Sequence, residues 1–150
     1  TIENMEVIAS ESPLNFIILR YADVLLSKAE ALIEGQNKNI PEAIALINKI
    51  RNGRTDVKLP SLSTGLDLEE AREKLHKERR IEFALEGLYW DDVRRWEIGP
   101  KIYPQQVKGA NGELIDTKFA NGYDLIRNQL LPIPDGEISL NPKLIQNKGY

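Results

Sequence analysis

Apolar residues recur at steps of three and four along residues 16–34, and this pattern constrains the fold more than any other feature. Such spacing places side chains on one face of an α-helix, which turns once in about 3.6 residues. Gly35 follows where a glycine commonly ends a helix. The expected inward face consists of Ile18, Ala22, Leu25, Leu26, Ala29, Leu32 and Ile33. The chain is therefore predicted to open with an amphipathic helix.

A second helix is predicted after a short polar link. Pro41 is tolerated in a first helical turn, and Glu42 suits the positive end of the helix dipole. Gly53 is the expected end of this helix. Its inward face would be formed by Ala43, Ile44, Ile47 and Ile50. Two helices joined by a short link pack antiparallel, so the prediction is a helical hairpin.

Two further helices are predicted before residue 98. Thr64 and Asp67 are the two candidate caps of the third, and for Asp67 as the cap Glu70 stands in the capping-box position. This helix is expected to run to about residue 86. Its expected buried face is Leu68, Ala71, Leu75, Ile81 and Leu85. Gly87 separates it from a short helix over residues 89–97. Two successive helix pairs resemble the tetratricopeptide type of repeat.

Residues 98–150 have a different character, because their prolines and glycines exclude a long helix. Asn111 and Gly112 form a turn signal between residues 102–108 and 113–119, which is typical of a β-hairpin. The prolines of residues 131–150 favour an extended chain. We expect this chain to be a C-terminal strap whose apolar side chains pack against the helical half. Those side chains are Leu131, Ile133, Ile138, Leu140 and Leu144.

The 150 residues, 41% of them hydrophobic, fit a single domain of mainly α class. We expect two helical hairpins over residues 16–97, then a loop-rich segment with few short strands and the strap over residues 98–150. The chain starts at Thr1 without an initiator methionine. An N-terminal part of the full protein is therefore expected to be missing.

Residues 78–96, ERRIEFALEGLYWDDVRRW, combine four arginines and five acids with residues suited to burial. A buried charge costs several kcal/mol, roughly, unless it is paired. Helical spacing places Arg79 near Glu82, Asp91 near Arg94 and Arg95, and Asp92 near Arg95. We interpret Arg79, Glu82, Asp91, Asp92, Arg94 and Arg95 as a structural ion-pair network.

Two alternatives for this segment are weaker. Its arginines, Arg80 included, would suit a phosphate or carboxylate, but the interleaved acids oppose an anion site. Trp90 and Trp96 would suit a nucleic-acid surface, yet the chain has a net charge of −3. Nucleic acid is therefore not an expected partner.

Catalytic, cofactor and metal motifs are not found in the sequence. It has no cysteine and no glycine-rich phosphate loop, and His76, its one histidine, stands in no metal or triad pattern. A hydrolase using Glu78, Glu82 or Asp91 is disfavoured, because these acids are better explained as ion-pair partners. We expect a protein that is not an enzyme and uses no cofactor or metal.

Aromatic residues of the loop-rich half are the candidates for ligand contact. Tyr103, Phe119 and Tyr123 have rings that stack well on a sugar. Such residues also anchor loops onto helices, and this alternative is favoured.

Four blocks of sequence together resemble the C-terminal region of the SusD/RagB family. They are RYADVLLSKAEAL at residues 20–32, INKIR at 47–51, the charged segment at 78–96, and LLPIPDGEISLNPKLIQNKGY at 130–150. The last two are the specific ones, and the resemblance covers residues 16–150. It implies a mainly helical scaffold of tetratricopeptide-like pairs. It identifies no ligand residue, because the family's glycan-contacting aromatics lie largely before this region.

The resemblance implies a nutrient-binding lipoprotein on the cell-surface side of a Gram-negative outer membrane. Such a protein captures oligosaccharides or other nutrients and delivers them to a TonB-dependent transporter. Its lipid is attached at an N-terminal cysteine, and the chain contains none, so the anchor is expected to lie outside it. The alternative function is a tetratricopeptide-like adaptor that binds a peptide in an open groove.

Overall fold

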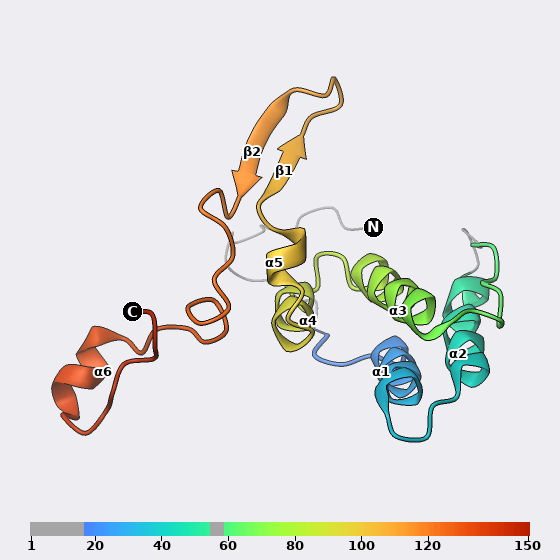
Figure 1. Ribbon diagram of the computed structural model, residues 1–150, viewed down its shortest axis with the longest axis horizontal. Helices are drawn as coiled ribbons and strands as arrows, with labels where there is room; N and C mark the ends of the chain where they lie inside the picture. The colour runs from blue at the N-terminus through green and yellow to red at the C-terminus, as the bar shows by residue number, and fades with distance from the viewer. Residues whose placement is uncertain (1–16, 55–58) are drawn as a thin grey trace, which may run out of the picture. The chain divides into compact units, whose positions relative to one another are not determined.

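The computed structural model describes residues 17–54 and 59–150. The chain divides into two compact units, Thr1–Glu82 and Phe83–Tyr150. Within the described ranges the protein has six helices and one two-stranded sheet (Figure 1). This confirms the mainly α fold class predicted from the sequence. Phe16, the expected start of the first helix, lies outside the described residues.

The first unit begins with the predicted helical hairpin. Helix α1 (Tyr21–Glu34) and helix α2 (Ile40–Gly53) are antiparallel, because Lys28 Nζ lies 2.8 Å from Glu42 Oε1 while Lys49 Nζ lies 3.4 Å from Tyr21 Oη. The side chains buried between helices include Leu26, Ala29, Ile33, Ala43, Ile44 and Ile47. The predicted inward faces of both helices therefore form the core of this unit.

The start of α1 differs from the prediction. Residues 17–20 are not helical, and Ile18 is 85% exposed although the periodicity placed it on the inward face. Arg20 has extended backbone angles and is the residue before the first helical turn. Consecutive β-branched residues favour extended backbone, which is a physical reason for the later start.

Helix α3 (Leu68–Glu82) begins with the predicted capping box. The Glu70 amide donates to Asp67 Oδ1 at 2.9 Å, and the Asp67 amide donates to Glu70 Oε2 at 3.0 Å. These two bonds satisfy amides that the helix itself leaves without a partner. The capping box fixes where α3 starts, and the start of the helix determines on which side of α3 each later residue lies.

Asp67→Ala is expected to lower the free energy of unfolding by about 1 kcal/mol, because it removes the acceptor for the Glu70 amide. Urea unfolding of the wild type and the variant measures this difference. Thr64→Ala is the matched control, since Asp67 rather than Thr64 supplies the cap. An equal loss in both variants would contradict the assignment of the cap.

The buried face of α3 departs from the prediction after Leu75. Ala71 and Leu75 are fully buried, but Ile81 is 42% exposed and Leu85 is fully exposed. Six residues after Leu75 correspond to about 600° of helical rotation, which turns Ile81 well away from the core. Glu78 and Arg79 take the buried positions, 1% and 5% exposed. Leu85 lies beyond the helix end at Glu82, in a left-handed conformation with φ of 68°.

The second unit contains two short helices followed by the predicted β-hairpin. Helix α4 (Tyr89–Arg95) matches the predicted helix, and α5 (Gly99–Ile102) adds one turn. Strands β1 (Gln105–Lys108) and β2 (Leu114–Lys118) pair antiparallel. Gly112 in the connecting turn has φ of 82°, a conformation that favours glycine. The hairpin turn predicted at this position is therefore confirmed.

The C-terminal tail of the second unit has its own hydrogen bonds. Gln146 accepts from the Ile133 amide and donates to the Ile133 carbonyl, both at 2.8 Å. Residues 135–140, expected to be extended, form helix α6 (Asp135–Leu140). Leu131 and Leu140 are 68% and 84% exposed. The packing of these side chains against the helical half, as a C-terminal strap, stays a prediction.

Candidate functional site

The charged segment contributes a buried ion-pair cluster to the first unit. Arg51 Nη1 lies 2.6 Å from Glu78 Oε2, and the Glu78 side chain is 2% exposed. Arg79 Nη1 donates to Asp23 Oδ1 at 2.8 Å, so it links α3 to α1. Arg51 also donates from Nε to the Pro60 carbonyl at 2.9 Å. The partners come from three helices and the α2–α3 link, which makes the cluster part of the unit's core.

Glu82 is a second centre of the same cluster. Arg20 Nη1 lies 2.5 Å from Glu82 Oε1, and Arg54 Nη2 pairs with Glu82 Oε2. Burial acts to raise the pKa of the Glu82 carboxyl, but the hydrogen bonds from Arg20 and Arg54 outweigh burial and lower it. Sequence spacing proposed Arg79 as the Glu82 partner. The structure pairs Glu82 with Arg20 and Arg54 from distant segments, which no spacing within one helix reveals.

The lowered pKa of Glu82 gives a testable acid dependence. The unfolded glutamate has a pKa of 4.5, so the Glu82 contribution is present above that pH and is lost as the pH falls through the lower folded pKa. Glu82→Gln should therefore lower the unfolding midpoint at neutral pH, and the gap should close in acid. Thermal unfolding of both proteins from about pH 7 to pH 3 measures this. A gap that stays constant over this range would contradict it.

Helix α4 carries the other four residues of the predicted network, all in the second unit. Arg95 Nη2 lies 2.8 Å from Asp92 Oδ1, and Asp92 is 3% exposed. Arg94 Nη1 lies 3.4 Å from Asp91 Oδ1, and the Asp91 side chain is 70% exposed. Arg94 also donates from Nε to the Gln129 carbonyl at 2.8 Å, and Gln129 Nε2 donates to the Arg94 carbonyl at 3.0 Å. This reciprocal clamp fixes residue 129 against α4.

Four aromatic rings form a cluster in the second unit. Trp90 of α4 stacks on Phe119 with centroids 5.5 Å apart, and Tyr103 stacks on Tyr123 at 5.9 Å. Tyr103 and Phe119 are 4.5 Å apart. Burial raises the pKa of the Tyr123 hydroxyl, an effect that Arg94 opposes. The rings of the three sequence candidates thus pack on one another and on α4, as expected for loop anchors.

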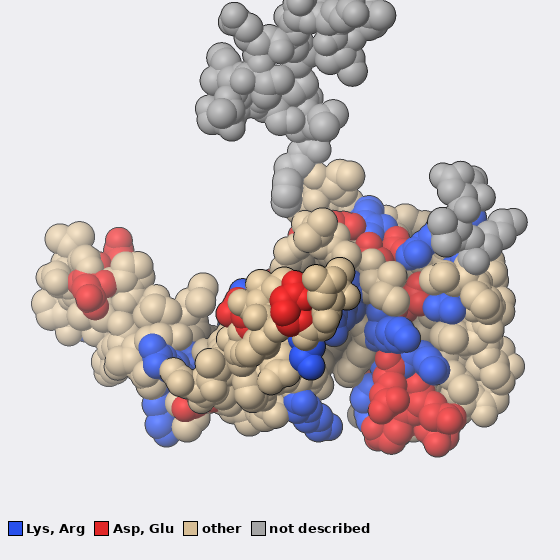
Figure 2. All heavy atoms as spheres, turned by 90° about the horizontal axis from the view of Figure 1, so that it is seen from above, with Lys and Arg blue, Asp and Glu red and all other residues tan. Residues whose placement is uncertain are grey.

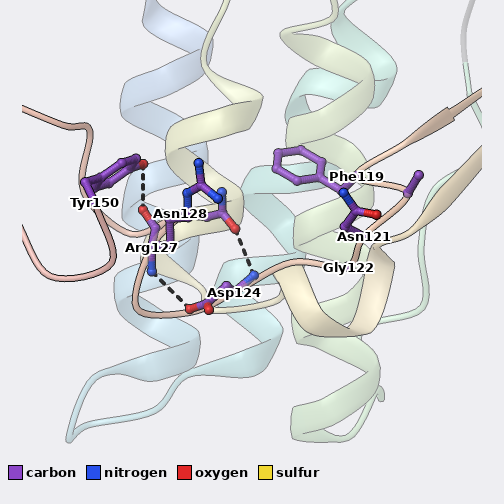
Figure 3. Close-up of a pocket in the computed structure, with 8 residues that line it drawn as sticks. Phe119, Asn121, Gly122, Asp124, Arg127, Asn128 and Tyr150 are labelled. Carbon is purple, nitrogen blue, oxygen red and sulfur yellow. Dashed lines mark hydrogen bonds between the residues drawn. The ribbon is translucent and has the colours of Figure 1, made fainter.

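A pocket of about 460 Å³ lies beside this aromatic cluster (Figure 3). It is lined by Phe119, Ala120, Asn121, Gly122, Asp124, Arg127, Asn128 and Tyr150. Phe119 thus belongs to both cluster and pocket. Tyr123 lines an adjoining hollow of about 610 Å³, and Tyr103 lines neither of these two. Aromatic rings beside a few amide and guanidinium groups are the kind of lining that small-molecule pockets have.

A tight turn positions the polar wall of the pocket. The Asp124 carboxylate accepts from the Ile126 amide at 2.7 Å and the Arg127 amide at 3.0 Å, while Asn128 Oδ1 accepts from the Asp124 amide at 2.8 Å. Hydrogen bonds from the Arg127 and Ile126 amides lower the pKa of the Asp124 carboxyl. The Tyr150 hydroxyl donates to the Arg127 carbonyl at 2.9 Å. The last residue of the chain is thereby tied to the turn.

The lining of the pocket contains one side-chain carboxylate. Cleavage by the general mechanism needs two carboxyl groups, one of which must carry a proton. Asp124 is the one carboxylate among the eight lining residues, and its lowered pKa keeps it ionised. Sequence reasoning did not identify Asp124, Arg127 and Asn128 as site residues, because only the folded turn brings them beside Phe119.

The described residues contain neither a membrane-spanning helix nor a cluster suited to a metal ion. Among them, no helix is long and apolar enough to cross a membrane. The described part also has no group of three or more histidine, aspartate or glutamate side chains arranged to hold a metal ion. On the face shown in Figure 2, acidic and uncharged residues interrupt the basic ones.

The helical hairpin, the short second-unit helices and the charged segment define a mainly helical protein. The family model described as the SusD family matches residues 9–150, and the chain belongs to this family. It is 35% identical over 145 residues to SusD-like protein P2 of Formosa agariphila, covering 93% of this chain and 27% of that protein. It is 40% identical over 144 residues to SusD-like protein P38 of the same organism, covering 91% and 25%.

Solved structures agree with this assignment. A SusD-like protein from Bacteroides fragilis superposes with a TM-score of 0.71 at 37% identity, covering 91% of this chain and 26% of that one. A SusD homolog from Bacteroides thetaiotaomicron gives a TM-score of 0.70 at 28% identity, covering 97% and 30%. The chain therefore spans about a quarter of the length of the curated relatives given above.

Proposed function

We propose that the protein is a nutrient-binding subunit of an outer-membrane uptake complex, and that its ligand is an oligosaccharide. The observation that carries this proposal is the SusD family match over residues 9–150. The pocket beside Phe119 supports it, because an aromatic wall and amide donors suit a sugar. The protein captures its ligand by these contacts without cleaving it.

The proposal includes a location and a partner. The protein acts on the cell-surface side of a Gram-negative outer membrane, held there by an N-terminal lipid, and passes its ligand to a TonB-dependent transporter. The adaptor alternative is less favoured, because the family match extends through residues 98–150, outside the helical hairpins that such an adaptor would use.

Co-purification tests the partner and the location. The intact protein, extracted from membranes of its native host in mild detergent, should bring down a TonB-dependent transporter. Recovery from the cytosolic fraction without such a transporter would overturn this part of the proposal. A separate saccharide titration tests the ligand class.

A further inference from the structure

The Arg127 guanidinium differs from most arginines of the described structure in having no oxygen acceptor. Other arginines donate to carboxylate or carbonyl oxygens: Arg20, Arg51, Arg54, Arg72, Arg79, Arg94 and Arg95. Among the residues that the structure describes, Arg127 has no ion pair and its guanidinium donates no hydrogen bond. Its five N–H donors are therefore available at the pocket wall.

Arg127 is nevertheless held in a defined position. Its amide donates to Asp124 Oδ1 at 3.0 Å, and its carbonyl accepts from the Tyr150 hydroxyl at 2.9 Å. Its guanidinium carbon lies 5.2 Å from the centroid of the Tyr150 ring, a cation–π contact. Gly149 packs so closely that an added Cβ would lie 3.0 Å from Arg127 Cβ. A guanidinium fixed in this way loses little freedom when it binds a ligand.

The one side-chain carboxylate of the pocket, that of Asp124, accepts backbone hydrogen bonds through one of its two oxygens. Its Oδ1 accepts from the Ile126 and Arg127 amides, and no ion pair joins Asp124 to Arg127, although the charge of Arg127 helps to lower the pKa of the Asp124 carboxyl. In Figure 3 the Arg127 side chain extends away from the Asp124 carboxylate, on the side of the pocket that carries the Tyr150 ring. Asn128 uses its oxygen to accept from the Asp124 amide, which leaves its side-chain NH₂ as a further donor. The pocket thus offers side-chain donors of Arg127 and Asn128 beside the Asp124 carboxylate.

We propose that this pocket binds an anionic sugar, with the carboxylate or sulfate of the sugar held by Arg127. This inference rests on the proposed saccharide-binding function and adds the charge of the ligand. A planar guanidinium forms two parallel hydrogen bonds with a carboxylate or sulfate, whereas a neutral hydroxyl leaves its charge uncompensated. Asn128 and Asn121 supply hydrogen bonds to the ring hydroxyls, and Phe119 supplies the apolar wall.

The test is a calorimetric titration of the intact protein with two matched pairs of probes. One pair is an oligogalacturonide and its methyl ester, and the other is a sulfated galactan oligosaccharide and its desulfated form. In at least one pair the charged member should bind about tenfold or more tightly than the neutral member, as expected for charge-assisted hydrogen bonds. The pair in which the preference is seen identifies the anionic group that the pocket binds, a uronate carboxylate or a sulfate ester.

Variants of the same protein assign the preference to Arg127. Arg127→Gln should abolish it, and Arg127→Lys should retain part of it, because lysine keeps the charge but not the planar fork. Lys143→Gln removes the same charge outside the pocket and should bind as the wild type does. The exposed position of Arg127 makes a folded variant the expected outcome, and circular dichroism checks this.

Failure of this inference is distinguishable from failure of the proposed function. If the neutral saccharide of each pair binds as tightly as the charged one, the anionic-sugar site alone is overturned. A preference for the charged saccharide that persists in Arg127→Gln would have the same consequence. If the protein binds no saccharide of either pair and none of a wider neutral panel, both the anionic-sugar site and the proposed saccharide-binding function are overturned.

Discussion

Glu78→Ala is expected to lower the free energy of unfolding by about 3–5 kcal/mol, one of the two largest effects that we predict. The Glu78 side chain is 2% exposed and lies 2.6 Å from Arg51 Nη1. Its removal leaves the Arg51 guanidinium, which is 15% exposed, without its acid. An uncompensated charge in a buried site costs more than the net stabilisation that the intact pair supplies.

Lys77→Ala is the matched control, one residue earlier on the same helix but exposed. It should change stability by less than about 0.5 kcal/mol. A double-mutant cycle with Arg51→Ala adds a sharper test, since removing both partners should cost less than the sum of the single losses. Equal urea midpoints for Glu78→Ala and Lys77→Ala would contradict a buried pair.

Gly99→Ala is the second large effect and should cost about 1–3 kcal/mol through overpacking. Gly99 is buried, and an added Cβ would lie 2.4 Å from Cδ1 and Cε1 of the Tyr123 ring. The ring is unable to move without disturbing its stacking on Tyr103. The near-ultraviolet circular dichroism spectrum should change together with the unfolding midpoint, because both depend on the packing of the aromatic cluster.

Gly136→Ala is the control for this substitution. Gly136 lies in α6 with no atom within 4 Å of the position of an added Cβ. Its replacement should be neutral or stabilising by up to about 1 kcal/mol, since alanine restricts the unfolded chain. If both glycine variants unfold at the wild-type midpoint, the close packing of Tyr123 on α5 is wrong.

Local rules predicted the elements of the fold well. The capping box of Asp67 and Glu70, the glycine turn at Gly112 and the inward faces of the first two helices depend on residues a few positions apart. The buried face of α3 failed beyond Leu75 for a tertiary reason. Glu78 is buried there because Arg51 approaches from α2, and helical periodicity alone contains no information about that partner.

The candidate site was less predictable for the same reason. Aromatic composition identified Phe119, but the donors around it come from a turn whose shape depends on the Asp124 carboxylate. The signal in the sequence is an aspartate followed, after Leu125 and Ile126, by Arg127 and Asn128, and aspartates are common in turns without any pocket. Tyr150 reaches this turn only through the folded tail.

The charged segment at residues 78–96 has a structural role on this account. Its Glu78 and Arg79 are core residues of the first unit, and its Asp92 is a buried ion-pair partner in the second. These residues hold the scaffold, and the proposed ligand site lies in the loops after it. The charged block is therefore distinct from the proposed ligand pocket, whereas the second specific block, residues 130–150, contributes Tyr150 to it.

Titration of the intact protein with a panel of neutral and anionic oligosaccharides, followed by product analysis, tests the central claim most directly. The account predicts saturable binding of at least one oligosaccharide class and recovery of that saccharide at its original length. Absence of binding across the panel, or shortening of the saccharide during incubation, would contradict a non-enzymatic nutrient-binding protein.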